Sequence, residues 1–379
     1  MRTIPTDRNR TLPVLDLAAQ YRGLKEELVT AVLQVLEDQH FILGPNVAAL
    51  EGEIANFCRS PHAIGVASGT DALILALRAA GVRPGDEVIV PAFSFVATAD
   101  AVSILGAKPL FADIDPATFN IDMEHASTLV TDRTVAIIPV HLYGQPADMD
   151  KVRDLAERRR LIVIEDCAQA LGASWKGTPV ASIGDYGCIS FFPTKNLGGC
   201  GDGGMITTRD REGADHLRML RAHGSRKKYH FEEQGMNSRL DELQAAILRV
   251  KLPKLTAWND ARRAIANLYK QALENVEDLA LPLEATGSVH VYHQFTVRVP
   301  VRDHVQMALL EAGVQSVVYY PVPLHLQNMY IPLGHKKGEL PAAECAAAEV
   351  LSLPMFPEMT EMDVAYVSEC LKEILVSGR

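Results

Sequence analysis

The sequence predicts an α/β fold built on a mostly parallel sheet. Apolar, β-branched runs typical of strands alternate with amphipathic runs typical of helices over roughly the first 240 residues. Such alternation places parallel strands side by side and covers both faces of their sheet with helices. The chain has 379 residues, 48% hydrophobic and 22% charged, so it is long enough for a large core and a second, smaller domain.

The expected elements follow in chain order. Apolar residues at three- and four-residue steps over 16–38 predict an amphipathic helix, and 40–47 reads as a loop. Ser68 then introduces a helix over 72–80 that Gly81 ends. Further on, we expect strands at 87–90, 110–112, 134–140 and 161–165, and helices at 97–105 and 149–160.

The chain changes character after about Arg239. Residues 240–269 read as a long helix, broken near Pro253, that bridges to a C-terminal unit. That unit has a strand-like run at 292–299, a helix near 304–312 and a proline-rich segment at 320–325. We therefore expect a large domain over 1–250 and a smaller C-terminal α+β domain over 251–379.

Charge and cysteine content exclude several classes of function. The formal net charge is −10, without long blocks of one sign, which argues against a general nucleic-acid binder. The six cysteines form no CxxC pair, and no Cys/His spacing of a metal site occurs, so we expect reduced thiols and no metal. The N-terminal stretch has no apolar signal core, and no run reaches the roughly 18 apolar residues of a membrane span. We expect a cytoplasmic protein.

Lys195 is the most informative residue of the sequence. The run 188–192 is apolar enough for a buried strand, and Pro193 forces the chain out of the sheet, so Lys195 follows a strand's carboxyl end. Ligands of open α/β sheets collect outside those ends. A lysine with a pKa lowered by desolvation can form a Schiff base with pyridoxal phosphate. The alternative is a solvated loop lysine.

Three further residues suit a pyridine-containing cofactor. Asp166 ends the apolar run 161–165, and a buried carboxylate beside a pyridine would keep the ring nitrogen protonated. Gln169 follows it and could donate to a ring hydroxyl. Phe95 follows the strand at 87–90 and could stack on the ring. Taken alone, Asp166 could equally be a helix cap and Phe95 a core residue.

Other residues suit anionic groups. Gly69 and Thr70 open a helix, where backbone N–H groups and the helix dipole favour a phosphate. Asn237 and Arg239 lie where a loop enters a helix, and an arginine fork suits a carboxylate or phosphate. The alternatives are a plain helix cap for the first pair and a surface role for the arginine.

Five motifs together resemble the DegT/DnrJ/EryC1/StrS family of pyridoxal-phosphate sugar aminotransferases. They are GTDAL at 69–73, PAFSFVATADA at 91–101, VIEDCAQALGA at 163–173, SFFPTKNLGGCGDGGMI at 190–206 and GMNSRLDELQAAIL at 235–248. The resemblance covers nearly the whole chain. It implies the fold-type I aminotransferase architecture, with a large domain whose mostly parallel sheet is of the seven-stranded type.

The resemblance also implies roles for single residues. Lys195 would carry the cofactor and transfer the proton, and Asp166 would meet the pyridine nitrogen. Gln169 would meet the ring 3-hydroxyl, and Phe95 would stack on the ring. The phosphate would be bound at Gly69, Thr70 and Ser190, and by Asn237 of a partner subunit, so the active site requires a homodimer. Arg239 would hold the carboxylate of the amino donor, expected to be L-glutamate.

Substrate choice follows from weaker signals. The segments 141–149, 223–239 and 319–330 look most like the branch that aminates C3 of dTDP-3-keto-6-deoxyhexoses. Lys227 and Lys228, next to Arg226, could meet the diphosphate, or could form a solvated charge run. His325 could approach the sugar, although a lone histidine is usually structural. Amination at C4 and a non-catalytic regulatory role remain as alternatives, and retention of Lys195 favours transamination over dehydration.

Overall fold

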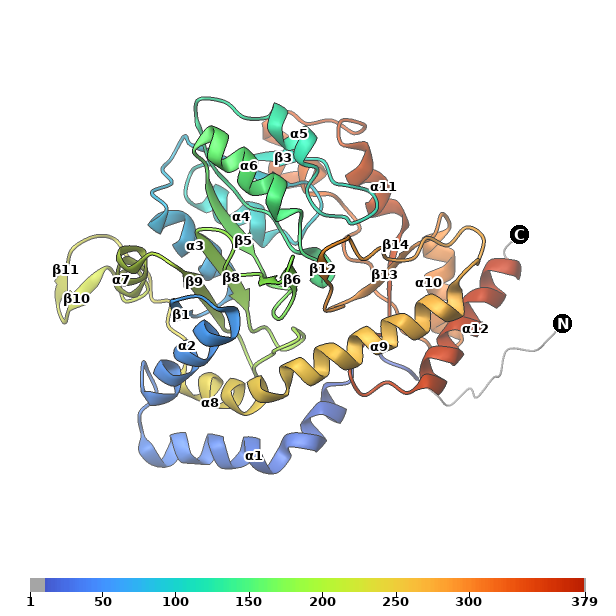
Figure 1. The fold of residues 1–379 in the computed structure, drawn as a ribbon, viewed down its shortest axis with the longest axis horizontal. Helices are drawn as coiled ribbons and strands as arrows, with labels where there is room; N and C mark the ends of the chain where they lie inside the picture. The colour runs from blue at the N-terminus through green and yellow to red at the C-terminus, as the bar shows by residue number, and fades with distance from the viewer. Residues whose placement is uncertain (1–10, 378–379) are drawn as a thin grey trace.

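A seven-stranded sheet forms the centre of the computed structural model, which describes residues 11–377 (Figure 1). Its strand order is β1-β9-β8-β5-β4-β2-β3. The pairs β2–β3, β2–β4, β4–β5 and β5–β8 are parallel, and β9 runs antiparallel to both of its neighbours. The strands are β1 (His62–Val66), β2 (Glu87–Pro91), β3 (Lys108–Ala112), β4 (Thr134–Ile137), β5 (Ile162–Asp166), β8 (Tyr186–Ser190) and β9 (Gly204–Thr208). The predicted mostly parallel sheet is confirmed.

Helices cover both faces of the sheet. Successive residues of one strand lie in different hydrophobic clusters, as Val163 and Ile164 of β5 do, because side chains alternate between the two faces. The face of Ile164 packs against α3 (Gly69–Ala79), α4 (Ala97–Ile104), α7 (Arg211–Leu220) and α11 (Pro341–Glu349). The opposite face packs against α2 (Pro45–Cys58), α5 (Met123–Thr128), α6 (Met149–Arg159) and α8 (Glu242–Lys251).

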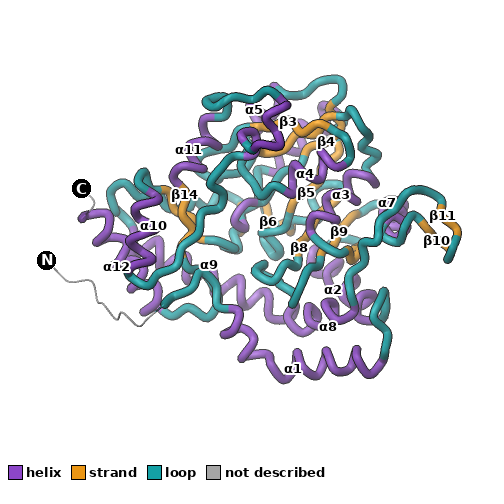
Figure 2. Tube along the Cα trace, turned by 180° about the vertical axis from the view of Figure 1, so that it is seen from behind, coloured by secondary structure: helices purple, strands orange, loops and turns teal. Residues whose placement is uncertain are grey.

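A long helix connects this sheet to a C-terminal cluster. After α8 and the short turn η2 (Leu252–Lys254), α9 (Leu255–Leu273) crosses the molecule (Figures 1 and 2). Leu255 at its start packs beside the large sheet, whereas Tyr269 near its end packs in the second cluster. That cluster is formed by the antiparallel pair β13 (Phe295–Arg298) and β14 (Val350–Leu353), with α10 (Arg302–Glu311) and α12 (Glu361–Ser377).

The segment between α10 and β14 returns to the large sheet. It carries η3 (Leu324–Leu326), η4 (Asn328–Leu333) and α11, and Leu324, Tyr330 and Leu340 are buried in the cluster that includes α3 and α4. A division of the chain near residue 250 therefore remains a prediction, because residues beyond it contribute to both clusters.

Several expected boundaries differ from the structure. The stretch 40–47 is a loop only as far as Gly44, because Pro45 begins α2, which the sequence analysis had missed. The strand expected over 188–192 ends at Ser190, and the strand expected over 134–140 ends at Ile137. The predicted helix over 16–38 is present as α1 (Leu17–Asp38), and the predicted break near Pro253 is confirmed.

Several short strands and a short helical turn lie outside the large sheet. The hairpin of β10 (Ser225–Lys227) and β11 (His230–Phe231) projects past α7 at one end of the molecule (Figures 1 and 2). A three-stranded sheet joins β12 (Ser288–Val289), β6 (Ser174–Trp175) and β7 (Thr178–Pro179), and η1 (Leu142–Gly144) follows β4.

Within residues 11–377, every helix is too short or too polar to cross a membrane. The first ten residues, part of the stretch in which the sequence analysis found no signal core, lie outside the described residues.

Candidate active site

The candidate residues gather at the carboxyl ends of the parallel strands. Asp166 is the last residue of β5, Lys195 lies five residues beyond the end of β8, and the segment carrying Phe95 follows β2. Parallel strands bring these ends to one edge of the sheet, which is where open α/β folds bind ligands. The order of strands in the sheet thus brings together residues that are about 100 positions apart in the sequence.

Lys195 is held in a tight turn. Its backbone N–H donates to Phe192 O at 2.9 Å, and the side chain is half-buried. Burial lowers the pKa of Lys195 from 10.5 to about 8, although the nearby carboxylate of Asp166 acts in the opposite direction. The neighbouring Asn196 anchors the turn, because its Nδ2 donates to Asn259 Oδ1 at 2.8 Å and to Val291 O at 3.2 Å.

Asp166 is buried and hydrogen-bonded at both carboxylate oxygens. Thr98 Oγ1 donates to Oδ2 at 2.8 Å, and the backbone N–H of Ala168 donates to Oδ1 at 3.1 Å. The backbone of Asp166 is also held, since its N–H donates to Pro139 O and its carbonyl accepts from His141 N. A carboxylate restrained in this way presents its remaining lone pairs in defined directions.

Gln169 and Phe95 meet a residue from the C-terminal part of the chain. Gln169 Oε1 accepts from the backbone N–H of Tyr143 at 2.7 Å, and its Nε2 donates to the hydroxyl of Tyr320 at 3.1 Å. The ring of Tyr320 lies 6.0 Å from that of Phe95, centroid to centroid. Phe95 is 54% exposed, so it is not a core residue, and its aromatic ring is available to a ligand.

The expected phosphate residues lie together. Gly69 and Thr70 begin α3, whose N-cap Ser68 accepts from Asp71 N at 3.0 Å. A Cβ added at Gly69 would lie 2.7 Å from the Cβ of Ser190, so the helix start and the end of β8 approach as closely as a glycine allows. Free backbone N–H groups and the Ser190 hydroxyl therefore occupy one corner of the site.

Asn237 and Arg239 follow a well-anchored segment. Ser238 between them accepts from Ala67 N at 3.2 Å and donates its N–H to Arg221 O. Asn237 is exposed, whereas Arg239 is half-buried and its Nε is buried without a hydrogen-bond partner among the described residues. An unpartnered buried guanidinium nitrogen is a candidate for binding an anionic group.

The three weaker candidates lie in different environments. Lys227 and Lys228 are exposed on the β10–β11 hairpin. His325 is fully buried, and its Nε2 lies 3.2 Å from Glu344 Oε1. In this conformation His325 offers no surface to a sugar, so its observed contacts are those of a structural histidine.

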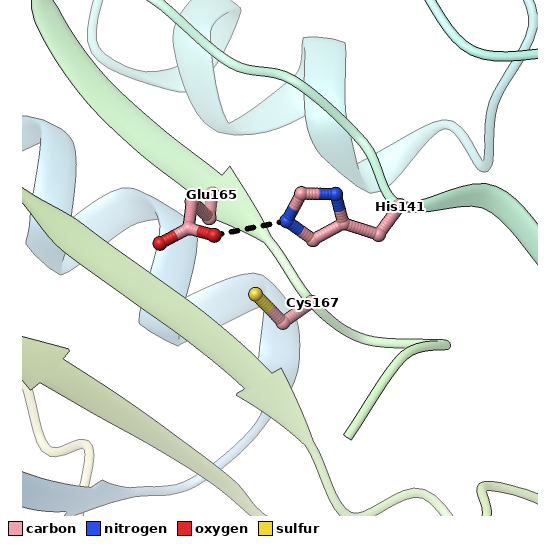
Figure 3. A group of neighbouring side chains, drawn as sticks. All are labelled: His141, Glu165 and Cys167. Atoms are coloured by element: carbon pink, nitrogen blue, oxygen red, sulfur yellow. Dashed lines mark hydrogen bonds and ion pairs between the residues drawn. The ribbon is translucent and has the colours of Figure 1, made fainter. Parts of the chain in front are cut away.

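A buried polar network is built around Glu165, whose side chain points to the other face of β5 from that of its neighbour Asp166. Figure 3 shows His141, Glu165 and Cys167, whose donor atoms all lie within 4.8 Å of one another, a spacing that a metal ion could use. The polar atoms of His141 and Glu165 already have hydrogen-bond partners within the protein. Glu165 accepts from the backbone N–H groups of residues 181, 183 and 184 and lies 3.0 Å from His141 Nε2.

The ring proton of His141 can be assigned from its second contact. Its Nδ1 accepts from the backbone N–H of Ala147 at 3.0 Å, so the proton lies on Nε2 and points to Glu165. Cys167 is a buried thiol whose pKa burial raises well above its ordinary value. This network connects the loop after β4, the end of β5 and the turn before β8. It therefore restrains the backbone of β5 next to Asp166.

Sequence reasoning missed Thr98, Tyr143 and Tyr320. Thr98 lies within one of the five motifs but carries no chemical signal of its own in the sequence. Tyr320 belongs to the proline-rich segment at 320–325, and nothing local in the sequence indicates that it contacts Gln169, 151 positions away. Only the three-dimensional arrangement reveals these partners.

Comparisons with known proteins cover almost the whole chain. The DegT/DnrJ/EryC1/StrS aminotransferase family model matches residues 23–372. A pleiotropic regulatory protein of Geobacillus stearothermophilus is 52% identical, over 96% of this chain and 98% of the relative. A UDP-N-acetyl-3-dehydro-α-D-glucosamine 3-aminotransferase of Acidithiobacillus ferrooxidans is 48% identical, over 97% and 99%.

Solved structures agree with this result. The structure of Streptomyces venezuelae DesV, in complex with a ketimine intermediate, superposes with a TM-score of 0.95 at 43% identity, covering 97% of this chain and 99% of that one. NtdA of Bacillus subtilis, solved with its bound cofactor PMP, superposes with a TM-score of 0.88 at 32% identity, covering 99% of this chain and 85% of that one.

Proposed function

Because the chain belongs to the DegT/DnrJ/EryC1/StrS aminotransferase family, we propose that it moves an amino group from L-glutamate to C3 of a nucleotide-linked 3-keto sugar. The protein is a nucleotide-sugar aminotransferase, and its cofactor is pyridoxal 5′-phosphate. The residue roles, the amino donor, the position of amination and the subunit assembly are the proposal.

One observation carries the assignment of roles: a half-buried lysine amine with a lowered pKa lies near a buried carboxylate at the ligand-binding edge of the sheet. At pH 7, a pKa of about 8 rather than 10.5 increases the uncharged fraction of the amine about 300-fold. Only the uncharged amine is a nucleophile or a proton acceptor. Lys195 is therefore the one lysine that we assign to the chemistry.

The residues present fit the cofactor. The start of α3 at Gly69 lies close to Ser190, and its backbone N–H groups are available to a phosphate. Asp166 offers an anion for a pyridine nitrogen, and the exposed ring of Phe95 offers a stacking surface. Gln169 keeps a second Nε2 hydrogen for a ring hydroxyl, because Tyr320 takes only one. When bound, the cofactor supplies an aldehyde that condenses with amines and a ring that withdraws electron density.

The chain's own residues then act on protons and on placement. Lys195 Nζ accepts a proton from the donor's Cα, with a pKa near the working pH as general-base catalysis requires. In the second half-reaction the same amine moves a proton to the carbon that receives nitrogen. Arg239 binds the donor's carboxylate, which would satisfy its unpartnered Nε. Lys227 and Lys228 would meet the diphosphate of the sugar nucleotide.

We propose a homodimer with shared active sites. Helix α1 and the loop after it expose a group of large apolar side chains, namely Leu17, Tyr21, Leu33, Leu36, Phe41, Ile42 and Leu43. This surface adjoins the Asn237–Arg239 segment, because Ile42 forms a β-bridge with Asp241 and Phe41 O accepts from Glu242 N. A second copy covering this surface would lie close to the segment that carries Asn237.

The identity of the sugar substrate is the most specific part of the proposal. Relatives described as acting on dTDP- and on UDP-linked 3-amino sugars support amination at C3, and we assign the substrate as a dTDP-3-keto-6-deoxyhexose. The alternative position is C4 of a 4-keto-6-deoxysugar. A regulatory role is a further alternative, which the description of the Geobacillus relative favours. The cytoplasmic location expected from the sequence stays a prediction.

Absorption spectra test the enzyme assignment. The protein with its cofactor should show a visible band that L-glutamate bleaches, and Lys195→Ala should lose the band of the resting enzyme. A wild-type protein that takes up no pyridoxal phosphate would overturn the proposed function and favour the regulatory alternative.

Product analysis tests the substrate. The protein should be supplied with dTDP- and UDP-linked 3-keto sugars and with a 4-keto sugar, and the products examined by mass spectrometry and NMR. Nitrogen at C4 would refute the assigned position, and turnover of only the UDP-linked sugar would refute the assigned nucleotide.

Subunit mixing tests the shared site. Lys195→Ala and Asn237→Ala subunits are each expected to be inactive, and heterodimers of the two should regain part of the activity because one of their sites is intact. Verified subunit exchange without any recovery would refute the shared site.

A further inference from the structure

Two buried hydroxyl groups lie between the Phe95 loop and Asp166. Thr98, in the first turn of α4, is fully buried, and Ser94 is nearly so. Thr98 Oγ1 lies 2.8 Å from Asp166 Oδ2, and Ser94 Oγ lies 3.1 Å from Thr98 Oγ1. The three side chains therefore form a chain that runs from the loop after β2 to the end of β5.

The direction of these hydrogen bonds follows from the carboxylate. An ionised aspartate only accepts, so the single hydroxyl proton of Thr98 is committed to Asp166. Thr98 Oγ1 then accepts from Ser94, whose proton points along the chain towards Asp166. Both hydroxyl dipoles therefore stabilise negative charge on Asp166, as hydrogen bonds within one chain strengthen one another.

The same contacts decide which way the carboxylate faces. Thr98 holds Oδ2 and the backbone N–H of Ala168 holds Oδ1, so rotation of the carboxylate would break at least one bond. We propose that Thr98, supported by Ser94, is a positioning residue that keeps the hydrogen-bonded carboxylate of Asp166 turned towards the cofactor's ring nitrogen. This inference rests on the role that the proposed function gives to Asp166.

The arrangement also couples two parts of the cofactor site. Phe95, the proposed stacking ring, lies between Ser94 and Thr98 in the chain, and Thr98 N donates to Phe95 O at 3.3 Å. One short turn thus carries the stacking surface together with the groups that orient Asp166. A ring lying on Phe95 is then presented to Asp166 by a rigid, buried connection rather than by two independent loops.

Two matched pairs of variants isolate the hydroxyl group. Thr98→Val removes the donor and keeps the shape of the side chain. Thr98→Ala and Thr98→Ser both lack the methyl group and differ only in the hydroxyl, so they decide the matter if the valine variant fails to fold. Thr134→Val is the control, because Thr134 is a buried threonine at the start of β4, where the amino ends of the parallel strands lie and its hydroxyl accepts from Thr131 N.

The readouts are the ¹⁵N chemical shift of the labelled ring nitrogen in the resting holoenzyme and the dissociation constant of the cofactor. We expect wild type, Thr98→Ser and Thr134→Val to show a protonated ring nitrogen. Thr98→Val and Thr98→Ala should move the shift towards an unprotonated nitrogen and weaken cofactor binding about 10-fold or more, because a charge-assisted hydrogen bond is lost.

The outcomes separate this inference from the proposed function. If wild type binds the cofactor and responds to glutamate while Thr98→Val or Thr98→Ala keeps the wild-type chemical shift, the positioning role is refuted and the function stands. A serine variant that behaves like the alanine variant also refutes it, since serine retains the donor. If wild type binds no cofactor, the proposed function falls and this inference falls with it.

Discussion

Burial of the Lys195 amine should make the cofactor-free protein less stable at neutral than at alkaline pH, and Lys195→Met should remove this effect. The pKa of Lys195 is about 8 in the folded protein and 10.5 in the unfolded chain, so the unfolded chain binds more protons between these values. Stability rises with pH wherever the unfolded state binds more protons. The destabilisation by Lys195 is therefore fully present below pH 8 and is relieved as the pH rises towards 10.5.

The two pKa values give the magnitude. They correspond to a destabilisation of about 3.4 kcal/mol at pH 7 and about 1.4 kcal/mol at pH 9.5, a change of about 2 kcal/mol. Urea unfolding of the cofactor-free proteins, followed by circular dichroism at both pH values and one protein concentration, measures it. Lys195→Met should exceed wild type in unfolding free energy by about 2 kcal/mol more at pH 7 than at pH 9.5.

An exposed lysine provides the control for this experiment. Lys151 lies on the outer face of α6, and Lys151→Met should differ from wild type equally at the two pH values. If Lys195→Met also differs from wild type equally at pH 7 and 9.5, the amine is not desolvated. The physical basis for assigning Lys195 would then be lost.

Three other substitutions test separate parts of the site. Gly69→Ala should weaken cofactor binding about 10-fold or more in a cofactor titration, because the new methyl would lie 2.7 Å from Ser190 Cβ. Gly23→Ala on α1 is the control: its methyl meets no atom within 4 Å, and calorimetry should show a stabilisation of about 0.5–1 kcal/mol. Glu165→Gln should destabilise the protein by about 2 kcal/mol in urea unfolding, because an amide cannot accept from all four donors, and an unchanged midpoint would contradict this. Arg239→Lys should raise the KM for L-glutamate about 10-fold in steady-state assays with little effect on cofactor affinity, and the reverse pattern would assign Arg239 to the phosphate.

The main elements of the sheet could be predicted because their signals are local. The apolar run that ends at Asp166 and the proline after Phe192 both mark strand ends within a few residues. The boundary at Ser190 was predicted two residues too late, since Phe191 is as apolar as a strand residue and fully buried. Its N–H nevertheless bonds Gly203 O beyond the β8–β9 ladder as the chain turns.

The first two helices show where local patterns mislead. α2 was missed because the sequence Gly44-Pro45 reads as a loop, although proline is favoured in the first turn of a helix. On α1 the apolar stripe was correctly assigned to a helix, yet Leu17 and Tyr21 are exposed in the single chain. Apolar side chains that one chain leaves exposed are available to a second subunit. The periodicity of the sequence does not reveal which surface covers them.

Within the site, motif residues could be predicted and their partners could not. Asp166 and Lys195 have chemistry that the sequence displays directly. Tyr320 reaches Gln169 only because the segment between α10 and β14 returns to the large sheet. Contacts of this kind depend on tertiary packing between distant segments, for which a single sequence carries no local signal.

The turn that carries Lys195 is held by the C-terminal part of the chain. The turn that carries the lysine is anchored through Asn196 to Asn259 on α9 and to Val291, and His293 Nδ1 lies 3.0 Å from Asn196 Oδ1. Burial and the charge of Lys195 lower the pKa of His293 well below its ordinary value, so its ring is neutral and adds no second cation beside the amine. The strands of the large sheet supply the aspartate, but residues beyond α8 anchor the turn that carries the lysine.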